Sequence, residues 1–447
     1  MNKKDVVIVG GSAAGLTAGI TVRRHYPNKT ILLVRSEEQV LIPCGIPYIY
    51  GTVGSPEKNL IPDTLLEKNK IDLLIANATN IDTNAKVLKT DKGDVNYDRM
   101  ILATGSIPSV RPMPGFDMNG VYPIIKTVPH LTDLQKQLKS ANDVVVIGGG
   151  FIGIEFADEI KKSGVKNVTI IEIMSHCLNL AYDTEFCIDM EKHIAARNIN
   201  IITNVKVACV KGNGKVEAVE LENGREIPAN VVILGTGAMP NVKLAESAGL
   251  SLAPDGSIAV DRMMKTSNSS IFACGDCAQK VSFFGGVPST LKLASIATFE
   301  ARIAGANLFA IKRENIGTVG VWSTAVGNLA VGTAGLTETM ATKNGYDIIS
   351  VSVEGPNRHP GGMPGSTMTR MKLVFEKSSG ILLGGQVIGD SSVGELINAL
   401  SACIQKRMVA EDLAMFQTGT HPALTASPIV YPIVTAAEMA IAKMSKT

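Results

Sequence analysis

Aromatic residues are scarce in this chain of 447 residues, at 4%, and there is a single tryptophan. An excess of either charge is also missing, because 43 Lys and Arg nearly balance 41 Asp and Glu. We find no run of Lys and Arg dense enough to bind a phosphate backbone. These absences argue against nucleic acid as a partner.

Long uninterrupted hydrophobic runs are missing too. The N-terminal apolar run ends in glycines after Val9 and is too short for the core of a signal peptide. Pro428, Pro432 and Glu438 interrupt the apolar stretch 422–444, which favours a buried interface helix. We therefore expect no membrane span.

Cysteine is present without the pattern of a disulfide framework, since the seven cysteines are odd in number and widely scattered. A reducing cytoplasm is the expected compartment, and we expect no metal site. Glycine is abundant, at 43 residues, which suits parallel sheets joined by tight turns that approach a ligand. A chain of this length suggests two to three domains.

The chain contains one pattern twice. Residues 6–15 and 144–153 each consist of a buried-strand run, a glycine turn and the start of a helix. Each copy is followed by further strand runs at matching distances, at 30–34, 168–171, 100–105 and 231–237. The repetition predicts two Rossmann-like dinucleotide-binding domains in an α/β protein.

The glycines have a physical reason in both copies. A pyrophosphate must approach backbone N–H groups at a helix N-terminus, and larger side chains would block it. The second copy has all three glycines, and the first has the small Ser12 at the middle position. The residues expected to line the two nucleotide sites are Gly10, Ser12, Ala13, Gly15, Ala103, Thr104, Gly105, Gly148, Gly150, Phe151, Ile152, Gly153 and Gly237.

The ends of the second strands differ between the two copies. Glu172 ends the strand of the second copy, where a carboxylate accepts from ribose hydroxyls and repels a 2′-phosphate. NADH is therefore expected in preference to NADPH. Arg35 occupies the corresponding place in the first copy and is also assigned to cofactor binding. It breaks the expected pattern, so the residue that holds the first ribose stays open.

A third motif at 270–278 carries a family resemblance. This segment is a short strand followed by Gly275-Asp276. Together with the two glycine turns it resembles the pyridine nucleotide-disulfide oxidoreductases over essentially the whole chain. The resemblance implies that Asp276 binds the ribityl chain of FAD, that Ala294 contacts FAD, and that Glu155 lies beside the nicotinamide. Phe151 is expected to shield the flavin until NADH displaces it.

The same resemblance implies a division into three domains. Asp276 lies far along the chain from the first glycine turn, so the FAD domain, 1–112 and 241–315, is split around an inserted NAD domain, 113–240. Residues 316–447 are expected to form a C-terminal α+β dimerisation domain. There the sequence predicts strands within Val319–Thr333, Asp347–Glu354, Thr369–Phe375 and Leu383–Ile388, followed by a helix, Val393–Gln405.

Cys44 lies in the segment 41–48, which resembles the single-cysteine branch of the family. Ile49 stands where the two-cysteine branch has its second cysteine. The branch contains coenzyme A-disulfide reductases, NADH oxidases, NADH peroxidases and NADH-dependent persulfide or polysulfide reductases. We expect Cys44 to be the redox-active thiol, whereas Cys274 and Cys277 are expected to be structural.

The C-terminal segment is expected to complete the site of a partner chain. In two-cysteine relatives a His-Pro near the C-terminus donates a proton to the leaving thiol, and His421-Pro422 falls there. Imidazole suits this task because its pKa lies near neutrality. The resemblance therefore implies a homodimer with a shared active site.

The residues that would identify the substrate match the branch incompletely. Pro43 replaces the asparagine that precedes the cysteine in coenzyme A-disulfide reductases, and Arg358-His359 replaces a tyrosine pair. The first glycine turn lacks the histidine of NADH peroxidases. The candidate substrate contacts are Thr17, Arg24, Tyr48, Arg358 and His359.

We expect electrons to pass from NADH through FAD to Cys44 and on to a low-molecular-weight disulfide, persulfide or polysulfide. With one cysteine, the second sulfur must come from the substrate. An NADH oxidase that reduces dioxygen, with Cys44 cycling through a sulfenic acid, is an alternative. A flavin-binding redox sensor or electron-carrier partner without turnover is another.

Overall fold

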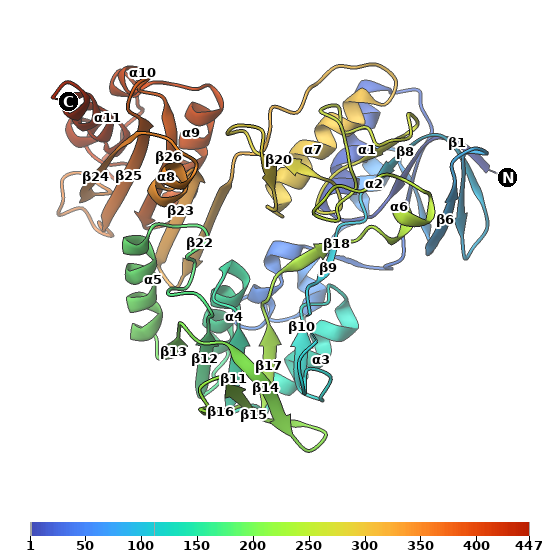
Figure 1. The fold of residues 1–447 in the computed structure, drawn as a ribbon, viewed down its shortest axis with the longest axis horizontal. Helices are drawn as coiled ribbons and strands as arrows, with labels where there is room; N and C mark the ends of the chain where they lie inside the picture. The colour runs from blue at the N-terminus through green and yellow to red at the C-terminus, as the bar shows by residue number, and fades with distance from the viewer. Residues whose placement is uncertain (1, 111, 447) are drawn as a thin grey trace. The chain divides into compact units, whose positions relative to one another are not determined.

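A computed structural model describes residues 2–110 and 112–446 of the chain. It divides into two compact units, and each is discontinuous in sequence. The first contains residues 1–113, 120–141 and 236–318, and the second contains residues 114–119, 142–235 and 319–447. Figure 1 shows the order of the elements along the chain.

The first unit is built on a mainly parallel sheet. Strands β5 (Asp72–Ile75), β2 (Ile31–Arg35), β1 (Asn2–Val9) and β8 (Val95–Leu102) are neighbours in that order, and β19 (Ile271–Ala273) also pairs with β8 in parallel. β7 (Val87–Thr90) and β6 (Ala78–Asp82) extend the sheet antiparallel. Helices α1 (Ala13–His25) and α7 (Ala294–Asn307) contact each other. Continuous apolar runs such as β2 are buried throughout, as expected of parallel strands.

The second unit contains another parallel sheet. Its strands follow the order β17 (Val231–Leu234), β11 (Asp143–Ile147), β12 (Asn167–Ile171) and β13 (Ile199–Ile202). Helix α4 (Phe151–Lys162) follows β11, and α5 (Thr184–Ala196) precedes β13. An antiparallel sheet of β14 (Val207–Gly212), β15 (Val216–Leu221) and β16 (Glu226–Pro228) follows in the sequence.

The same unit ends in an antiparallel sheet with helices. Its order is β22 (Val321–Val326), β23 (Leu329–Gly335), β26 (Leu382–Gly389), β25 (Met368–Glu376) and β24 (Ile348–Pro356). α9 (Val393–Gln405) packs on β23 and β26, and α11 (Pro432–Met444) packs on β24 and β25. α8 (Glu338–Lys343) and α10 (Ala410–Ala414) complete this part.

The remaining helices and strands are short, apart from the 11-residue α3. They are β3 (Val40–Leu41), β4 (Leu60–Ile61), α2 (Thr64–Lys68), β9 (Ser106–Pro108), β10 (Val121–Pro123), α3 (Val128–Leu138), β18 (Ala238–Pro240), α6 (Lys243–Ser247), β20 (Lys280–Val281) and β21 (Pro288–Ser289). Across 2–110 and 112–446, every helix is too short or too polar to cross a membrane.

The predicted α/β class with two Rossmann-like parallel sheets and a C-terminal antiparallel domain is confirmed. The run Val319–Thr333 is two strands, because Gly327, at φ +57°, turns the chain between β22 and β23. The exact boundaries of the three expected domains stay predictions.

Candidate nucleotide and thiol sites

The first glycine turn leaves no room for side chains. A Cβ at Gly10 would lie 2.1 Å from the carbonyl oxygen of Ala103, and one at Gly15 would lie 1.9 Å from that of Gly10. The turn opens into α1, whose N-cap is Ser12 and whose first residue is Ala13. Backbone N–H groups at such a helix N-terminus can receive a phosphate. The structure therefore brings together five of the predicted residues, Gly10, Ser12, Ala13, Gly15 and Ala103.

The second turn repeats this geometry within the second unit. A Cβ at Gly148 would lie 2.6 Å from the Gly235 carbonyl oxygen, and one at Gly153 would lie 1.8 Å from that of Gly148. Gly150 is the N-cap of α4, and its Cβ position faces open space. The predicted Ile152 is 47% exposed beside it. The second turn therefore has the same geometry as the first, and its anion-binding role stays a prediction.

Asp276 lies three residues after the end of β19, directly after Gly275, which has a φ of +80°. Its carboxylate accepts a hydrogen bond of 2.8 Å from the hydroxyl of Ser106. The hydroxyl of Thr104 donates to the Asn241 carbonyl at 2.6 Å. Parallel pairing of β8 and β19 therefore orients the predicted ribityl carboxylate beside the segment after β8.

Gly105 and Gly237 adopt φ values of +69° and +92°, and a Cβ at either would meet open space. Their conformations favour glycine without any need for close approach. Ala294 is the first residue of α7. These positions are compatible with cofactor contact, which stays a prediction.

A buried ion pair supports the Asp276 turn, and the sequence analysis missed it. Glu300 accepts hydrogen bonds from the Gly275 N–H at 2.8 Å and from the Lys280 ammonium at 3.3 Å. Lys280 also donates to the Gly275 carbonyl at 2.7 Å. Burial raises the pKa of Glu300 to about 7, against the opposing effect of Lys280. In the sequence, the only sign of this ion pair is a single glutamate within the mostly apolar segment that forms α7.

Cys274 and Cys277 flank this turn but are fully buried. The Cys277 thiol donates to the carbonyls of Cys274 at 3.4 Å and Leu102 at 3.6 Å. Burial raises the pKa of both thiols. This environment supports the structural interpretation of the pair, because the thiolate is the reactive form.

Cys44 is exposed on a short 3-10 turn, Pro43–Gly45. Asn59, a second residue that the sequence analysis missed, fixes this turn. It exchanges hydrogen bonds of 2.9 Å with the backbone of Ile42, and its side-chain oxygen would lie 2.0 Å from a Cβ at Gly45. The half-buried Tyr48 follows in the turn Pro47–Ile49.

Arg35 has a different environment from Glu172. Its buried guanidinium forms a bidentate pair with Asp63, at 2.6 and 2.8 Å, and donates to the carbonyls of Glu37 and Glu38. Its methylene groups lie under the first turn, since a Cβ at Gly11 would be 2.5 Å from the Arg35 Cδ. Most N–H groups of Arg35 therefore donate to protein acceptors. The carboxylate at this strand end is that of Asp63, which is partly exposed.

Glu172 is 9% exposed beneath the second turn. Its carboxylate accepts from the N–H of Gly149 at 2.6 Å and from that of Met174 at 2.7 Å. His176 is bonded to Glu191 through Nδ1 at 2.9 Å. The cluster places two carboxylates near the strand end, an unfavourable setting for a 2′-phosphate.

Phe151 begins α4 and lies between two aromatic rings, with centroids 6.0 Å from that of Tyr182 and 5.4 Å from that of Trp322. One helical turn later, Glu155 accepts a hydrogen bond of 2.7 Å from the Thr324 hydroxyl. Burial raises the pKa of Glu155 to about 7, and Glu159 adds to this effect while Thr324 opposes it.

The C-terminal candidates lie in one loop cluster. The His359 N–H donates to the Pro422 carbonyl at 3.1 Å, and Arg358 donates to the Pro364 carbonyl at 2.5 Å. The exposed His421 accepts from the Ala423 N–H through Nδ1 at 3.2 Å. Because Nδ1 accepts here, Nε2 is the ring nitrogen left to carry a proton outward.

Thr17 and Arg24 lie seven residues apart on α1, two turns along one face. Arg24 is exposed and Thr17 half-buried. The substrate role of both residues stays a prediction.

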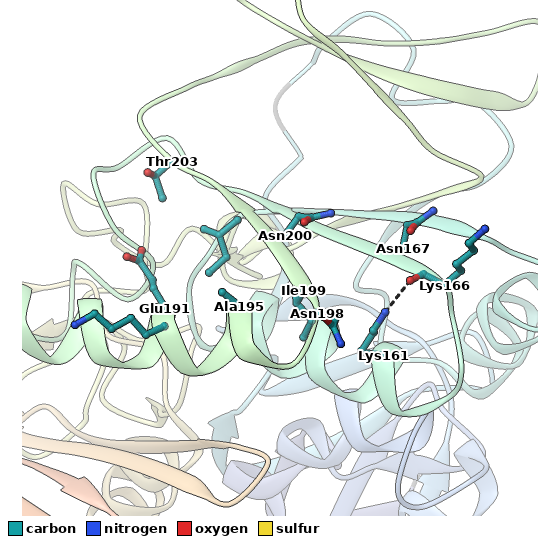
Figure 2. A pocket seen from close by; sticks show the side chains of 11 residues that line it. Lys161, Lys166, Asn167, Glu191, Ala195, Asn198, Ile199, Asn200 and Thr203 are labelled. Carbon is teal, nitrogen blue, oxygen red and sulfur yellow. Dashed lines mark hydrogen bonds between the residues drawn. The ribbon is translucent and has the colours of Figure 1, made fainter.

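A surface hollow of about 620 Å³ lies elsewhere in the second unit (Figure 2). Its lining includes Lys161, Lys166, Glu191 and Asn200 but none of the predicted site residues. The Lys161 ammonium donates to the Lys166 carbonyl at 2.7 Å, as Figure 2 shows. In the described part of the chain, no three His, Cys, Asp or Glu side chains are grouped to hold a metal ion.

Two family models match this chain. The family model described as pyridine nucleotide-disulphide oxidoreductase matches residues 4–301, and the model for the dimerisation domain of the same family matches residues 321–428. The chain belongs to this family. It is an oxidoreductase with FAD and NAD sites, and it has a dimerisation domain.

Similar proteins narrow the group. The chain is 30% identical to the NAD(P)H coenzyme A polysulfide/persulfide reductase of Pyrococcus horikoshii, over 98% of both chains. The NAD-dependent persulfide reductase of A. fulgidus has a TM-score of 0.92 and 30% identity, over 99% of this chain and 84% of that one. The water-forming NADH oxidase of Lactobacillus brevis, solved with NADH, has a TM-score of 0.89 and 25% identity, over 99% of each chain. The chain is thus an NAD(P)H-dependent flavin oxidoreductase of the NADH oxidase and coenzyme A persulfide reductase group.

Proposed function

We propose that Cys44 transfers electrons from NADH to a low-molecular-weight disulfide, persulfide or polysulfide. One observation carries this proposal: Cys44 is the exposed cysteine, whereas five of the other six are buried and Cys209 is half-buried. The pKa of each of those six thiols is raised, chiefly by burial. Attack on sulfur requires an accessible thiolate. Two similar proteins are named as persulfide reductases, which supports the same substrate class.

The residues fit the cofactors that the family uses. Gly10, Ser12 and Gly15 form an anion cradle with the packing a pyrophosphate needs, and Asp276 presents an oriented carboxylate for the ribityl chain. When bound there, FAD supplies two-electron chemistry between a nicotinamide and a thiol. NADH would occupy the turn Gly148–Gly153, with Glu172 accepting from the adenosine ribose.

The sulfur chemistry balances with one cysteine. The Cys44 thiolate attacks a substrate R–S–S–R′, a Cys44–S–S–R bond forms, and R′–S⁻ leaves. His421 of the partner chain, in its imidazolium form, donates a proton from Nε2 to the departing thiolate. Two electrons from NADH then reduce the mixed disulfide, release R–SH and restore the Cys44 thiolate. The substrate therefore supplies the second sulfur.

A screen of electron acceptors tests this proposal. Purified holoenzyme should consume NADH steadily with coenzyme A disulfide, other small disulfides or polysulfide, and slowly with dioxygen alone. Rapid consumption with dioxygen alone would favour the NADH oxidase alternative, which the Lactobacillus brevis structure supports as a candidate. Since the chain belongs to an enzyme family, the sensor without turnover is set aside.

The finer assignments belong to the same proposal. NADH is preferred over NADPH because the carboxylates of Glu172 and Glu191 lie at the strand end. The enzyme is a homodimer with shared sites, since Leu424 and Ile429 expose 72% and 89% of their surface beside His421. A reducing cytoplasm suits a chain with seven cysteines and no disulfide framework.

A further inference from the structure

Strand β22 of the dimerisation domain runs beside α4 of the NAD-binding domain, and both lie in the second compact unit (Figure 1). Residues four apart on the helix contact residues two apart on the strand. Phe151 meets Trp322, and Glu155 meets Thr324. Just beyond β22, the Gly327 N–H donates to Asp158 at 3.1 Å. The helix and the strand thus touch at successive points along their lengths.

The register follows from the two repeats. Four residues of helix advance about 6.0 Å, and two residues of strand advance about 6.6 Å. Phe151 and Glu155 share one helix face, and Trp322 and Thr324 share one strand face. A matched spacing on two regular elements positions both helix side chains at once.

The aromatic partners of Phe151 are themselves fixed. Trp322 sits in the β22–β23 ladder opposite Thr333. Tyr182 is 3% exposed, and its hydroxyl donates to the Val331 carbonyl at 3.1 Å. Phe151 and Trp322 are both half-buried, but Phe151 is the first residue of its helix. We therefore expect Phe151 to be the ring that moves.

We propose that Trp322 is a positioning residue that holds Phe151 in its resting place, so that the dimerisation domain sets how readily NADH enters. This inference rests on the proposed NADH site and on the expectation that the nucleotide displaces Phe151. The tilted ring contact with Trp322 stabilises the resting position, and NADH must overcome that stabilisation. Trp322 therefore weakens nucleotide binding without touching the nucleotide.

NAD⁺ binding to the holoenzyme, measured by calorimetry, tests the proposal without relying on activity. Because an aromatic pair contributes about 0.5–1.5 kcal/mol, Trp322→Leu should tighten NAD⁺ binding about 2- to 12-fold. Trp322→Phe keeps a ring and should give a smaller change. Ser323→Ala, on the exposed opposite face of β22, should leave binding unchanged.

A double-mutant cycle separates a direct effect from a general one. Phe151→Ala should tighten binding as well, and adding Trp322→Leu to it should have no further effect. Trp322 is the only tryptophan, so its emission should change when NAD⁺ displaces Phe151, and not in Phe151→Ala. Additive effects, unchanged binding in Trp322→Leu or weaker binding in both Trp322 variants would overturn the proposal. Absence of NAD⁺ binding to every form, wild type included, would instead refute the nucleotide site itself.

Discussion

The Ser106 hydroxyl donates a 2.8 Å hydrogen bond to the Asp276 carboxylate across 170 residues of sequence. The contact exists because β8 and β19 are parallel neighbours, so the segments that follow them emerge at the same edge of the sheet. The carboxylate is thereby oriented before any ligand arrives. Orientation of this kind reduces the entropic cost of binding.

The first prediction concerns FAD affinity. Asp276→Ala should weaken FAD binding by about 1.5–3 kcal/mol, as expected for a hydrogen bond to a charged group. Ser106→Ala should cost about 0.5–1.5 kcal/mol, because it loosens the carboxylate without removing it. Titration of apoprotein with FAD, followed by flavin fluorescence, measures both. Ser109→Ala in the same segment is the control, and an equal loss there would contradict a specific role for Ser106.

The second prediction concerns the nicotinamide nucleotide. Wild-type kcat/KM should favour NADH over NADPH by more than about tenfold, or ~1.4 kcal/mol. Glu172→Ala should narrow that ratio, mainly by improving NADPH. Steady-state kinetics with both nucleotides provide the measurement. A ratio that Glu172→Ala leaves unchanged would show that another residue selects the nucleotide.

The sequence could predict both nucleotide turns because each one is local. Strand run, glycines and helix start lie within ten residues, and the φ values of +120° at Gly10 and +106° at Gly148 favour glycine whatever surrounds the turn. The end of β2 shows that a role found in one copy of the repeat cannot simply be assigned to the other copy. Arg35 stands where Glu172 stands in the other copy, yet it pairs with Asp63, 28 residues later, which no local pattern links to it.

Residues that support the sites from a distance could not be predicted in this way. Asn59 braces the Cys44 turn, and Lys280 pairs with Glu300 below Asp276. Trp322 on β22 contacts Phe151 on α4, 171 residues earlier in the sequence. These contacts depend on which strands become neighbours, and hydrophobic periodicity gives the type of an element without its neighbours.

The third prediction concerns Cys44. Cys44→Ser should bind FAD and remain folded, but it should lose reduction of disulfides and polysulfide, because serine keeps the shape without thiolate nucleophilicity. NADH should still bleach the flavin absorbance. Cys209→Ser, which removes a half-buried thiol, is the matched control and should retain turnover. Sulfur reduction at the wild-type rate in Cys44→Ser would favour the NADH oxidase alternative.

The fourth prediction follows from Glu155, whose pKa burial raises from 4.5 to about 7. The folded state binds this proton more tightly than the unfolded state, so the contribution to stability is full below about pH 4.5 and is lost as pH rises through about 7. The melting temperature of Glu155→Gln minus that of wild type should therefore be more positive at pH 8 than at pH 5. Thermal unfolding at the two pH values measures this, and the exposed Glu217→Gln serves as control. An equal difference at both pH values would contradict a raised pKa.

The last prediction concerns a site shared between two chains. His421 accepts from the Ala423 N–H through Nδ1, so Nε2 is the nitrogen left to face a departing thiolate, to which the imidazolium form would donate a proton. His421→Ala should slow disulfide turnover by about 10² to 10⁴-fold while reduction of the flavin by NADH stays unchanged. A mixed dimer then tests sharing: one chain carries only Cys44→Ser and the other only His421→Ala. If each site combines Cys44 of one chain with His421 of the other, one site is doubly damaged and one is intact, so about half of the wild-type activity should return. Inactive mixed dimers would instead show that His421 acts within its own chain or takes no part in turnover.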